Sequence, residues 1–354
     1  MIKPWLSILL LFLLTCCADK KQSNQVVFKD QDLPKIKLQS VKLDFDEFMD
    51  PRVIDRKGRF LFVMESNRTT VDVPAIHIID TDDWSYYRSK GAKGHGPYEL
   101  AGANTFFRDN ARDSFRVYSR QDKKMLEYTI QDTSRLAIAE YKLPEIAFMV
   151  VRISPATDST FLGVSVDDPN RMIEFHRSGE RIAGYGEWEK VGTHPDLDNF
   201  QLFQINSGWF KGDQELGLHV FACIFRDRLE IFDYNTKEFI IVDGPSLDLP
   251  TFDVMGQDLY IPLEDNPYKY RDISITEDYI FALYGGIGEL EYRKTSKVAE
   301  KIYVFTHQGE PVTLLELDRS LMGLAVDTSK RKIYGITTDE NPGIAVFDLP
   351  DALL

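Results

Sequence analysis

Seven residues that could bind a ligand lie in segments that we expect to be loops on one face of the protein. Their side chains are guanidinium groups, an imidazole and a phenol, which together favour an anionic or carbohydrate-like ligand. They are Arg68, His95, Arg120, Arg226, Arg228, Tyr292 and Arg293. The alternative is a rim of solvated side chains that binds nothing, because arginines are mostly exposed in proteins.

Signatures of catalysis are missing from the sequence. It contains no Gly-x-Ser-x-Gly nucleophile motif, no His-Glu-x-x-His zinc motif, no paired Cys-x-x-Cys and no Walker loop. The segment 194–199 hints at a calcium loop through Asp196 and Asp198, but Phe200 stands where a third oxygen ligand belongs. We therefore predict no catalytic residue, no metal and no cofactor, and enzymatic activity stays an open alternative.

The chain is acidic and has a secretory N-terminus. Its formal net charge of -14 argues against a nucleic-acid partner. Lys3 and the apolar run 5–14 indicate a cleaved signal peptide, since ten residues are too few for a membrane-spanning helix. No other run is apolar enough to predict a transmembrane helix in the mature chain.

The signal ends in two cysteines, and this ending resembles a bacterial lipobox. We favour Cys17 as the lipidated residue, with Cys16 as the alternative and an ordinary signal peptide as a third possibility. Acyl chains would hold the protein on a membrane, which predicts an outer-membrane lipoprotein of the cell envelope whose membrane side is undetermined. Cys223 is then the lone internal cysteine, and its apolar surroundings predict burial.

A strand-like run of aromatic and β-branched residues recurs six times, at intervals of 46 to 62 residues. The six runs are residues 60–64, 115–118, 161–165, 218–221, 280–284 and 333–336. Each precedes a second run with strand-like alternation, at residues 75–80, 125–130, 171–176, 229–233, 301–306 and 344–348. The last pair, 332–349, is the clearest hairpin.

A third strand precedes each pair and a fourth follows it in most copies. Four antiparallel strands repeated six times predict an all-β, six-bladed β-propeller. The last unit has no fourth strand of its own, so we predict that residues 36–43 close the ring by pairing beside 344–348. A tandem of β-sandwiches is the alternative, but it would lack a period near fifty residues. The predicted domains are a signal peptide at 1–17, a polar tether at 18–35 and the propeller at 36–354.

The segment 91–100 resembles the Gly-x-Gly-Pro-Gly-Glu-Phe link between blades of NHL-type propellers. Its matching residues, which follow Gly91, are Gly94, Gly96, Pro97 and Glu99. Tyr98 replaces a glycine of the pattern and Leu100 replaces its phenylalanine. Together with the six repeats and the N-terminal cysteine, the chain resembles TolB-like six-bladed lipoproteins of Bacteroidetes, which implies an envelope lipoprotein of unassigned function.

Two interpretations of this loop stay open. Glycines 91, 94 and 96 allow positive φ and Pro97 restricts the backbone, which suits a tight crossing between blades. Alternatively, His95 or Glu99 faces a ligand. For the whole protein, the sequence favours a binding or scaffold module for protein, peptide or glycan. A metal-dependent hydrolase of the lactonase type, with its site in the central channel, is the alternative.

Overall fold

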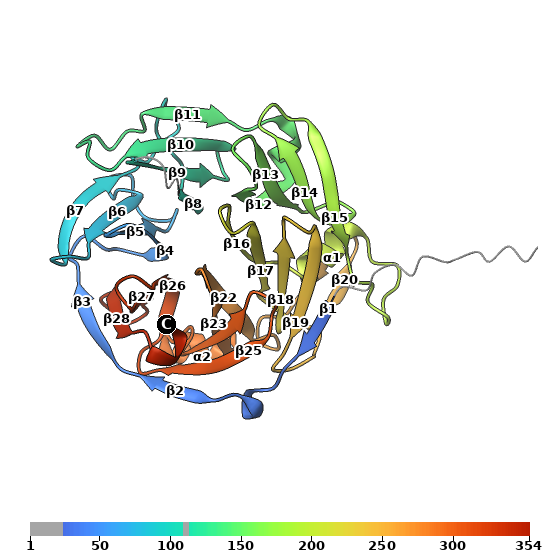
Figure 1. Ribbon diagram of the computed structural model, residues 1–354. Helices are drawn as coiled ribbons and strands as arrows, with labels where there is room; N and C mark the ends of the chain where they lie inside the picture. Colours follow the sequence, from blue (N-terminus) through green and yellow to red (C-terminus); the bar gives the residue numbers. More distant parts are fainter. Residues whose placement is uncertain (1–23, 109–112) are drawn as a thin grey trace, which may run out of the picture.

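The computed structural model describes residues 24–108 and 113–354, so the predicted signal peptide and both N-terminal cysteines lie outside the described residues. Six sheets of four or five strands surround a central axis (Figure 1). The protein is therefore the all-β, six-bladed propeller that the repeats predicted. None of the described helices is long and apolar enough to cross a membrane.

Each blade is an antiparallel meander. From the axis outwards, blade 1 contains β4 (Pro51–Lys57), β5 (Phe60–Glu65), β6 (Ile76–Asp80) and β7 (Ser85–Lys90). Blade 2 contains β8 (Thr105–Arg108), β9 (Ser114–Ser119), β10 (Lys124–Thr129) and β11 (Ala139–Lys142). Blade 3 contains β12 (Val150–Pro155), β13 (Thr160–Ser165), β14 (Asn170–His176) and β15 (Arg181–Glu187). The six sequence runs used to find the repeat form the second strand of every blade, and their partners form the third.

The other three blades carry additional strands from the N-terminus. Blade 4 contains β16 (Gly208–Asp213), β17 (Leu218–Cys223), β18 (Arg228–Asp233) and β19 (Glu238–Asp243). Blade 5 contains β22 (Tyr268–Ile275), β23 (Tyr279–Ile287), β24 (Lys301–Thr306) and β25 (Pro311–Leu317). Blade 6 contains β26 (Leu321–Asp327), β27 (Lys332–Thr337) and β28 (Gly343–Asp348).

The ring closes through β3 (Ser40–Asp44), which pairs antiparallel with β28 as the fourth strand of blade 6. The closure prediction is thus confirmed for residues 40–43 and wrong for 36–38. The latter belong to β2 (Lys35–Leu38), which pairs parallel with β25 of blade 5. The predicted segment was too long because Gln39 separates two strands, β2 and β3, which pair with different blades.

The N-terminal segment forms a belt along three blade edges. Part of the predicted tether forms β1 (Asn24–Val27), which adds parallel to β19 of blade 4. A 3₁₀ turn, η1 (Asp30–Asp32), leads on to β2 and β3. Residues 24–44 therefore add strands to the outer edges of blades 4, 5 and 6 in turn (Figure 1). These strands pair with backbone N–H and C=O groups that would otherwise be exposed at the sheet edges.

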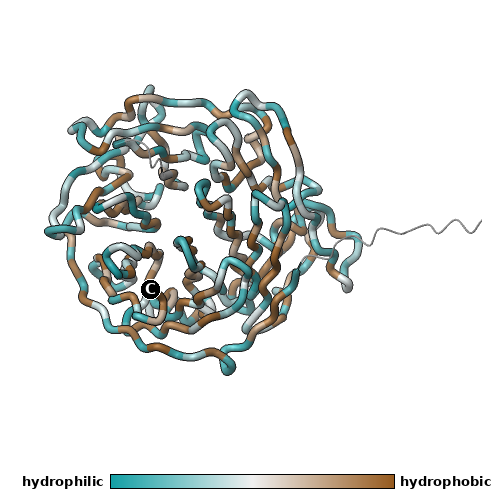
Figure 2. Tube along the Cα trace, viewed as in Figure 1, coloured by the Kyte–Doolittle hydropathy of each residue, from teal (hydrophilic) through white to brown (hydrophobic). Residues whose placement is uncertain are grey.

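The core is divided among the boundaries between blades. Six clusters of buried hydrophobic residues each join side chains of two neighbouring blades. Figure 2 shows why: hydrophobic residues recur along the strands of every blade and hydrophilic turns separate them. One blade cannot bury both faces alone, so the blades stabilise one another around the ring.

Two α-helices interrupt the strand pattern within the part of the chain that the structure describes. They are α1 (Asn199–Ile205) and α2 (Glu289–Thr295). Asp198, one of the acids of the calcium-loop hint, is the N-cap of α1. Its side chain accepts a hydrogen bond from the Gln201 backbone N–H at 2.8 Å, and its own backbone N–H donates to Gln201 Oε1 at 3.1 Å. The Asp-x-x-Gln spacing is a capping box, a signal that was present in the sequence.

Shorter elements complete the chain. The hairpin of β20 (Asp253–Met255) and β21 (Asp258–Tyr260) packs beside α1, and the remaining 3₁₀ turns are η2 (Glu145–Met149) and η3 (Asp351–Leu353). Cys223 is fully buried within β17, as predicted, and burial raises the pKa of its thiol to about 12.

Candidate functional site

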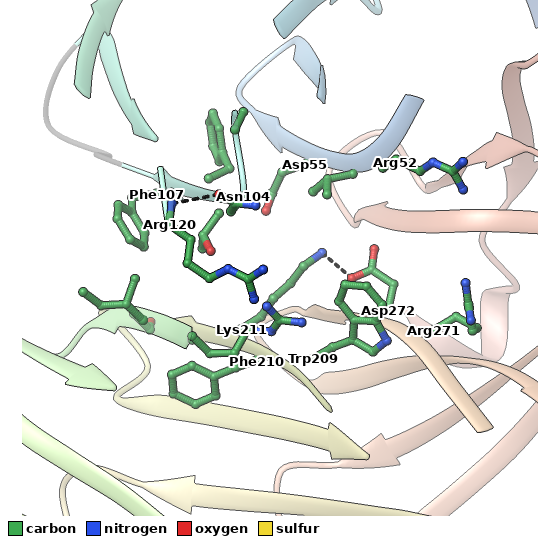
Figure 3. A pocket seen from close by; sticks show the side chains of 18 of the residues that line it. Arg52, Asp55, Asn104, Phe107, Arg120, Trp209, Phe210, Lys211, Arg271 and Asp272 are labelled. Carbon is green, nitrogen blue, oxygen red and sulfur yellow. Dashed lines mark hydrogen bonds and ion pairs between the residues drawn. The ribbon is translucent and has the colours of Figure 1, made fainter. Parts of the chain in front are cut away.

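A cavity of about 840 Å³ occupies the centre of the ring. Its wall is formed mainly by the innermost strands β4, β8, β12, β16, β22 and β26, and Figure 3 shows side chains from several of them pointing into the cavity. Ligand-binding cavities commonly enclose about 300–1,000 Å³, so the channel has the size of a binding site.

The two ends of the channel differ in charge. In an antiparallel blade the loop between the second and third strands lies at the end where the innermost strand begins, and we call this the loop end. Arg68, Arg120 and Tyr292, three of the predicted ligand residues, line the cavity from these loops. The turns at the opposite end contribute acidic residues, namely Asp158, Asp213 and Glu215.

Arg152 of β12 lines the channel without a counter-charge. Its Nε–H donates to the Gly208 carbonyl at 2.9 Å, and its guanidinium lies over the Trp209 ring, 5.2 Å from the centroid. Within residues 24–108 and 113–354, no carboxylate lies within ion-pair distance of it. Burial and then the nearby Arg120 lower the pKa of Arg152 to about 10.

Arg271 of β22 is a second such cation. Its guanidinium stacks over Tyr268 at 5.0 Å, and its Nε is buried without a hydrogen-bond partner in the described structure. The part of the chain that the structure describes places no carboxylate within ion-pair distance of this group either. Burial is the main cause that lowers the pKa of Arg271. Burying a cation without a counter-charge costs free energy. An anion bound next to either guanidinium would reduce this cost.

Two acids of the channel wall, Asp272 and Asp55, already accept hydrogen bonds. Asp272 accepts the Lys211 ammonium at 2.9 Å (Figure 3) and the backbone N–H groups of Ile273 and Leu324, both at 2.8 Å. Burial nevertheless raises the pKa of Asp272, with Lys211 acting against it. Asp55 accepts the Arg56 N–H at 2.8 Å. At the loop end, five lining arginines (Arg52, Arg68, Arg120, Arg152 and Arg271) outnumber the two lining acids, Glu65 and Glu289, so the net charge there is positive.

Two predicted ligand residues, Arg226 and Arg228, lie outside the channel and line a smaller cavity of about 300 Å³, where they are paired with acids. Arg228 binds both oxygens of Asp243, at 2.7 and 2.9 Å, and also contacts Glu189. Arg226 donates to Asn206 at 2.8 Å and to Glu189 at 2.9 Å. Although burial opposes it, the two arginines hold the pKa of Glu189 below its usual value. These contacts tie β18 and β19 to the connection that follows blade 3.

The loop with the family motif shows two different uses of glycine. Gly91 has a φ of 76°, but Gly94 and Gly96 do not have positive φ. A Cβ on Gly94 or Gly96 would instead lie 2.0 or 2.9 Å from the carboxylate of Glu99, whose oxygen accepts the Gly96 N–H at 3.0 Å. Tyr98, which replaces the motif glycine, has a φ of 62°. This position thus keeps the left-handed backbone that a glycine would adopt without strain.

His95 and Arg293 lie outside the channel lining. The His95 ring is exposed, with Nδ1 3.2 Å from Asp122 Oδ1. Arg293 is exposed on α2 and forms an ion pair with Glu289 at 2.9 Å. The structure therefore brings Arg68, Arg120 and Tyr292 to the cavity and leaves His95, Arg226, Arg228 and Arg293 elsewhere. Among the described residues, no group of three His, Cys, Asp or Glu side chains could hold a metal ion.

His219 of β17 is a buried titratable group outside the channel lining. Its ring is fully buried against Phe210, with centroids 5.9 Å apart, and neither nitrogen has a hydrogen-bond partner in the described structure. Burial, and secondarily Lys237, lowers its pKa to about 3. The native state therefore keeps this imidazole neutral at every physiological pH.

This burial predicts acid sensitivity of the fold. Between the unfolded pKa near 6.5 and the native value, only the unfolded state binds the proton, so stability falls as the pH falls. We expect His219 to account for a loss of about 2 kcal/mol between pH 7.5 and 5. Urea unfolding across this range should show a shallower pH dependence for His219→Phe than for the exposed-site control His194→Gln. Equal slopes for both variants would contradict the prediction.

The most informative channel residues were missed by sequence reasoning. They are Arg52, Arg152, Trp209, Arg271 and Met322, all on the innermost strands. A signal was present: an arginine stands eight or nine residues before the second-strand run in three of the six repeats, at Arg52, Arg152 and Arg271. Aligning the repeats by blade would have placed these arginines at one level of the channel.

The fold and cavity define a class: a six-bladed β-propeller with a ligand-sized central channel whose loop end is rich in arginine. The family model for TolB-like 6-blade propeller-like proteins matches residues 35–329, and the chain belongs to this family. No functionally curated protein matches the sequence.

Solved structures with low sequence identity share the fold. One is a protein of Bacteroides fragilis described as exported, with 14% identity and a TM-score of 0.56, covering 92% of this chain and 99% of that one. Another is a member of the DUF4221 family from Bacteroides vulgatus, with 11% identity and a TM-score of 0.56, covering 90% and 98%.

Proposed function

We propose that this protein is a non-enzymatic binding module of the cell envelope that takes an anionic ligand into its central channel from the loop end. The observation that carries the proposal is the pair Arg152 and Arg271, two guanidiniums in the channel wall with no carboxylate within ion-pair distance among the described residues. A bound anion would supply the charge-assisted hydrogen bonds that the described protein groups leave unmade.

The cavity limits how much of a ligand can enter. A volume of about 840 Å³ admits a small molecule, an acidic side chain or one or two sugar units, with the rest of a larger peptide or glycan held outside. Trp209 and Tyr268, which already stack on the two arginines, provide flat apolar surface next to the charge.

Envelope location is part of the same proposal. The N-terminal signal with Cys17, or Cys16, supports export and lipid attachment, and the description of the Bacteroides fragilis structure as exported agrees with it. A lipid anchor would place the channel near a membrane surface, where a binding module can retain a ligand without chemistry of its own.

Fluorescence of Trp209 tests the proposal, because this ring lies directly under Arg152. In a Trp84→Phe/Trp188→Phe background, Trp209 is the remaining tryptophan of the mature chain. Titration with a panel of carboxylated, sulfated and phosphorylated mono- and disaccharides should reveal binding. Arg152→Gln should weaken it about 10- to 100-fold, the effect of losing hydrogen bonds to a charged group.

The matched control is Arg181→Gln, because Arg181 and its partner Asp168 both lie outside the channel lining, and this change should leave affinity unchanged. Equal affinities of wild type and Arg152→Gln for every anion that binds would refute the proposed function.

A further inference from the structure

A β-bulge recurs at the head of the innermost strands. The pairing register shifts between Pro51 and Val53 in blade 1, between Tyr270 and Asp272 in blade 5, and between Leu321 and Gly323 in blade 6. The extra residues are Arg52, Arg271 and Met322. Bulges change the direction of a side chain and are frequent beside functional sites. Blade 3 has a similar shift at Val151, which does not line the cavity, whereas the extra residues of the three consecutive blades 5, 6 and 1 all line it.

The two arginines meet at the sulfur of the methionine. Arg52 Nη1 lies 3.7 Å from Met322 Sδ, and Arg271 Nη2 lies 3.9 Å from the same atom. A thioether is a weak acceptor, whereas guanidinium groups bind planar oxyanions strongly and with two parallel hydrogen bonds. The sulfur therefore occupies the position at which an oxyanion would satisfy both cations. Methionine is flexible and adapts to displacement more easily than a branched residue.

The local charge selects among oxyanions. Arg52 is already paired with Asp50, at 2.6 Å, whereas Arg271 lacks an ion pair within the described residues. The cluster Arg52, Arg271 and Asp50 thus carries one net positive charge, which matches a singly charged carboxylate. A phosphate dianion would be left with an excess negative charge, and Glu289, which lines the cavity near Arg271, would repel it further.

Aromatic rings lie beside this cluster. Tyr268 stacks under Arg271, and Tyr292 of α2 lines the same part of the cavity. Figure 3 shows Arg52 and Arg271 on the same side of the channel as Asp272. A ligand whose carboxylate reaches the two arginines would lay its ring or chain against these aromatic side chains.

We propose that Arg52 and Arg271 form a carboxylate subsite of the channel and that Met322 fills it until the ligand displaces the thioether. The subsite rests on the proposed binding function and names the chemical group it recognises. Because only the carboxylate is specified, an acidic sugar and an aromatic acid are both candidate sources of it.

Displacement of Met322 can be measured directly by NMR of the protein with [methyl-¹³C]methionine. The Met322 resonance is assigned with Met322→Leu, and Met49 and Met255, which are 63% and 64% exposed, serve as internal references. The probes are galacturonate, its neutral counterpart galactose, benzoate and inorganic phosphate. We expect the Met322 methyl resonance to shift with galacturonate or benzoate and to stay in place with galactose and phosphate. The response to one carboxylate over the other identifies the source.

Substitution separates this subsite from arginines elsewhere in the protein. Arg271→Gln should weaken the Met322 response at least tenfold, while Arg181→Gln, which lies outside the channel lining, should leave it unchanged. If Arg271→Gln does not fold, Arg52→Gln at the more exposed arginine is used instead, and it should weaken the same response.

The outcomes distinguish two failures. If an anion changes Trp209 fluorescence but no carboxylate moves the Met322 methyl, the subsite is wrong and the binding function stands. Displacement by phosphate as strong as by carboxylates would overturn the assignment to carboxylate. If no anion affects either reporter, both proposals fail.

Discussion

Replacing Phe28 with alanine is expected to lower the free energy of unfolding by about 3–5 kcal/mol, the usual cost of removing a buried phenylalanine. Phe28 follows β1 in the belt and is only 5% exposed. Its ring packs edge-on against Tyr303 and Phe305 of β24, with centroids 5.1 and 5.3 Å away. The Phe28 N–H also donates to the Asp243 carbonyl at 3.1 Å, so the side chain and the backbone together fasten the belt to blades 4 and 5.

The neighbouring residue offers a matched control. Val27 is 53% exposed, and Val27→Ala should change stability by no more than about 0.5 kcal/mol. Urea unfolding gives both free energies. Hydrogen exchange should in addition show faster exchange of β2 amides in Phe28→Ala, because the belt then detaches before the ring opens. Unfolding free energies that are equal for the two variants would show that the belt does not depend on Phe28.

Arg228→Met should destabilise the protein by about 3–5 kcal/mol, because it leaves Asp243 buried without its counter-charge. Both residues are largely buried, at 7% and 6% exposure, and they share two hydrogen bonds. Asp243 also accepts a hydrogen bond from Gln25 of the belt at 2.9 Å. Loss of the arginine therefore weakens both the outer strand of blade 4 and the start of the belt.

A second Arg–Asp pair provides the comparison. Arg181 binds Asp168 in a similar manner, but its side chain is 38% exposed, so Arg181→Met should cost only about 0–1 kcal/mol. Adding Asp243→Leu to Arg228→Met should recover part of the lost stability, since it removes the unpaired charge. If Arg228→Met unfolds at the same urea concentration as wild type but binds channel ligands more weakly, Arg228 acts in binding and its structural assignment is wrong.

Local patterns in the sequence were enough to predict the blades. Enrichment in aromatic and β-branched residues belongs to each strand by itself, and so the runs that begin at Phe60, Phe161 and Ile333 could be recognised one at a time and counted. The closing strand was found because blade 6 lacked one. Its boundary at Gln39 was not predictable, since β2 and β3 have the same strand character and differ only in the blade that each one meets.

The arginines show where sequence reasoning ends. Arg226 and Arg228 were expected in a ligand-binding loop, and no local signal reveals that Glu189 and Asp243 approach from other segments to bind them. The fold determines such ion pairs, because their partners are 15 to 39 residues away along the chain.

The sequence by itself therefore determined the architecture: six four-stranded units, a closing strand at the N-terminus and a family resemblance carried by one loop. Only the tertiary structure decided how Arg52, Arg271 and Met322 come together in the channel. Arg52, Arg271 and Met322 are separated by up to 270 residues, and they meet at one thioether only because the belt closes the ring and register shifts turn all three side chains toward the axis. Strand periodicity is a local property of the chain, whereas convergence on a channel exists only after all six blades have assembled.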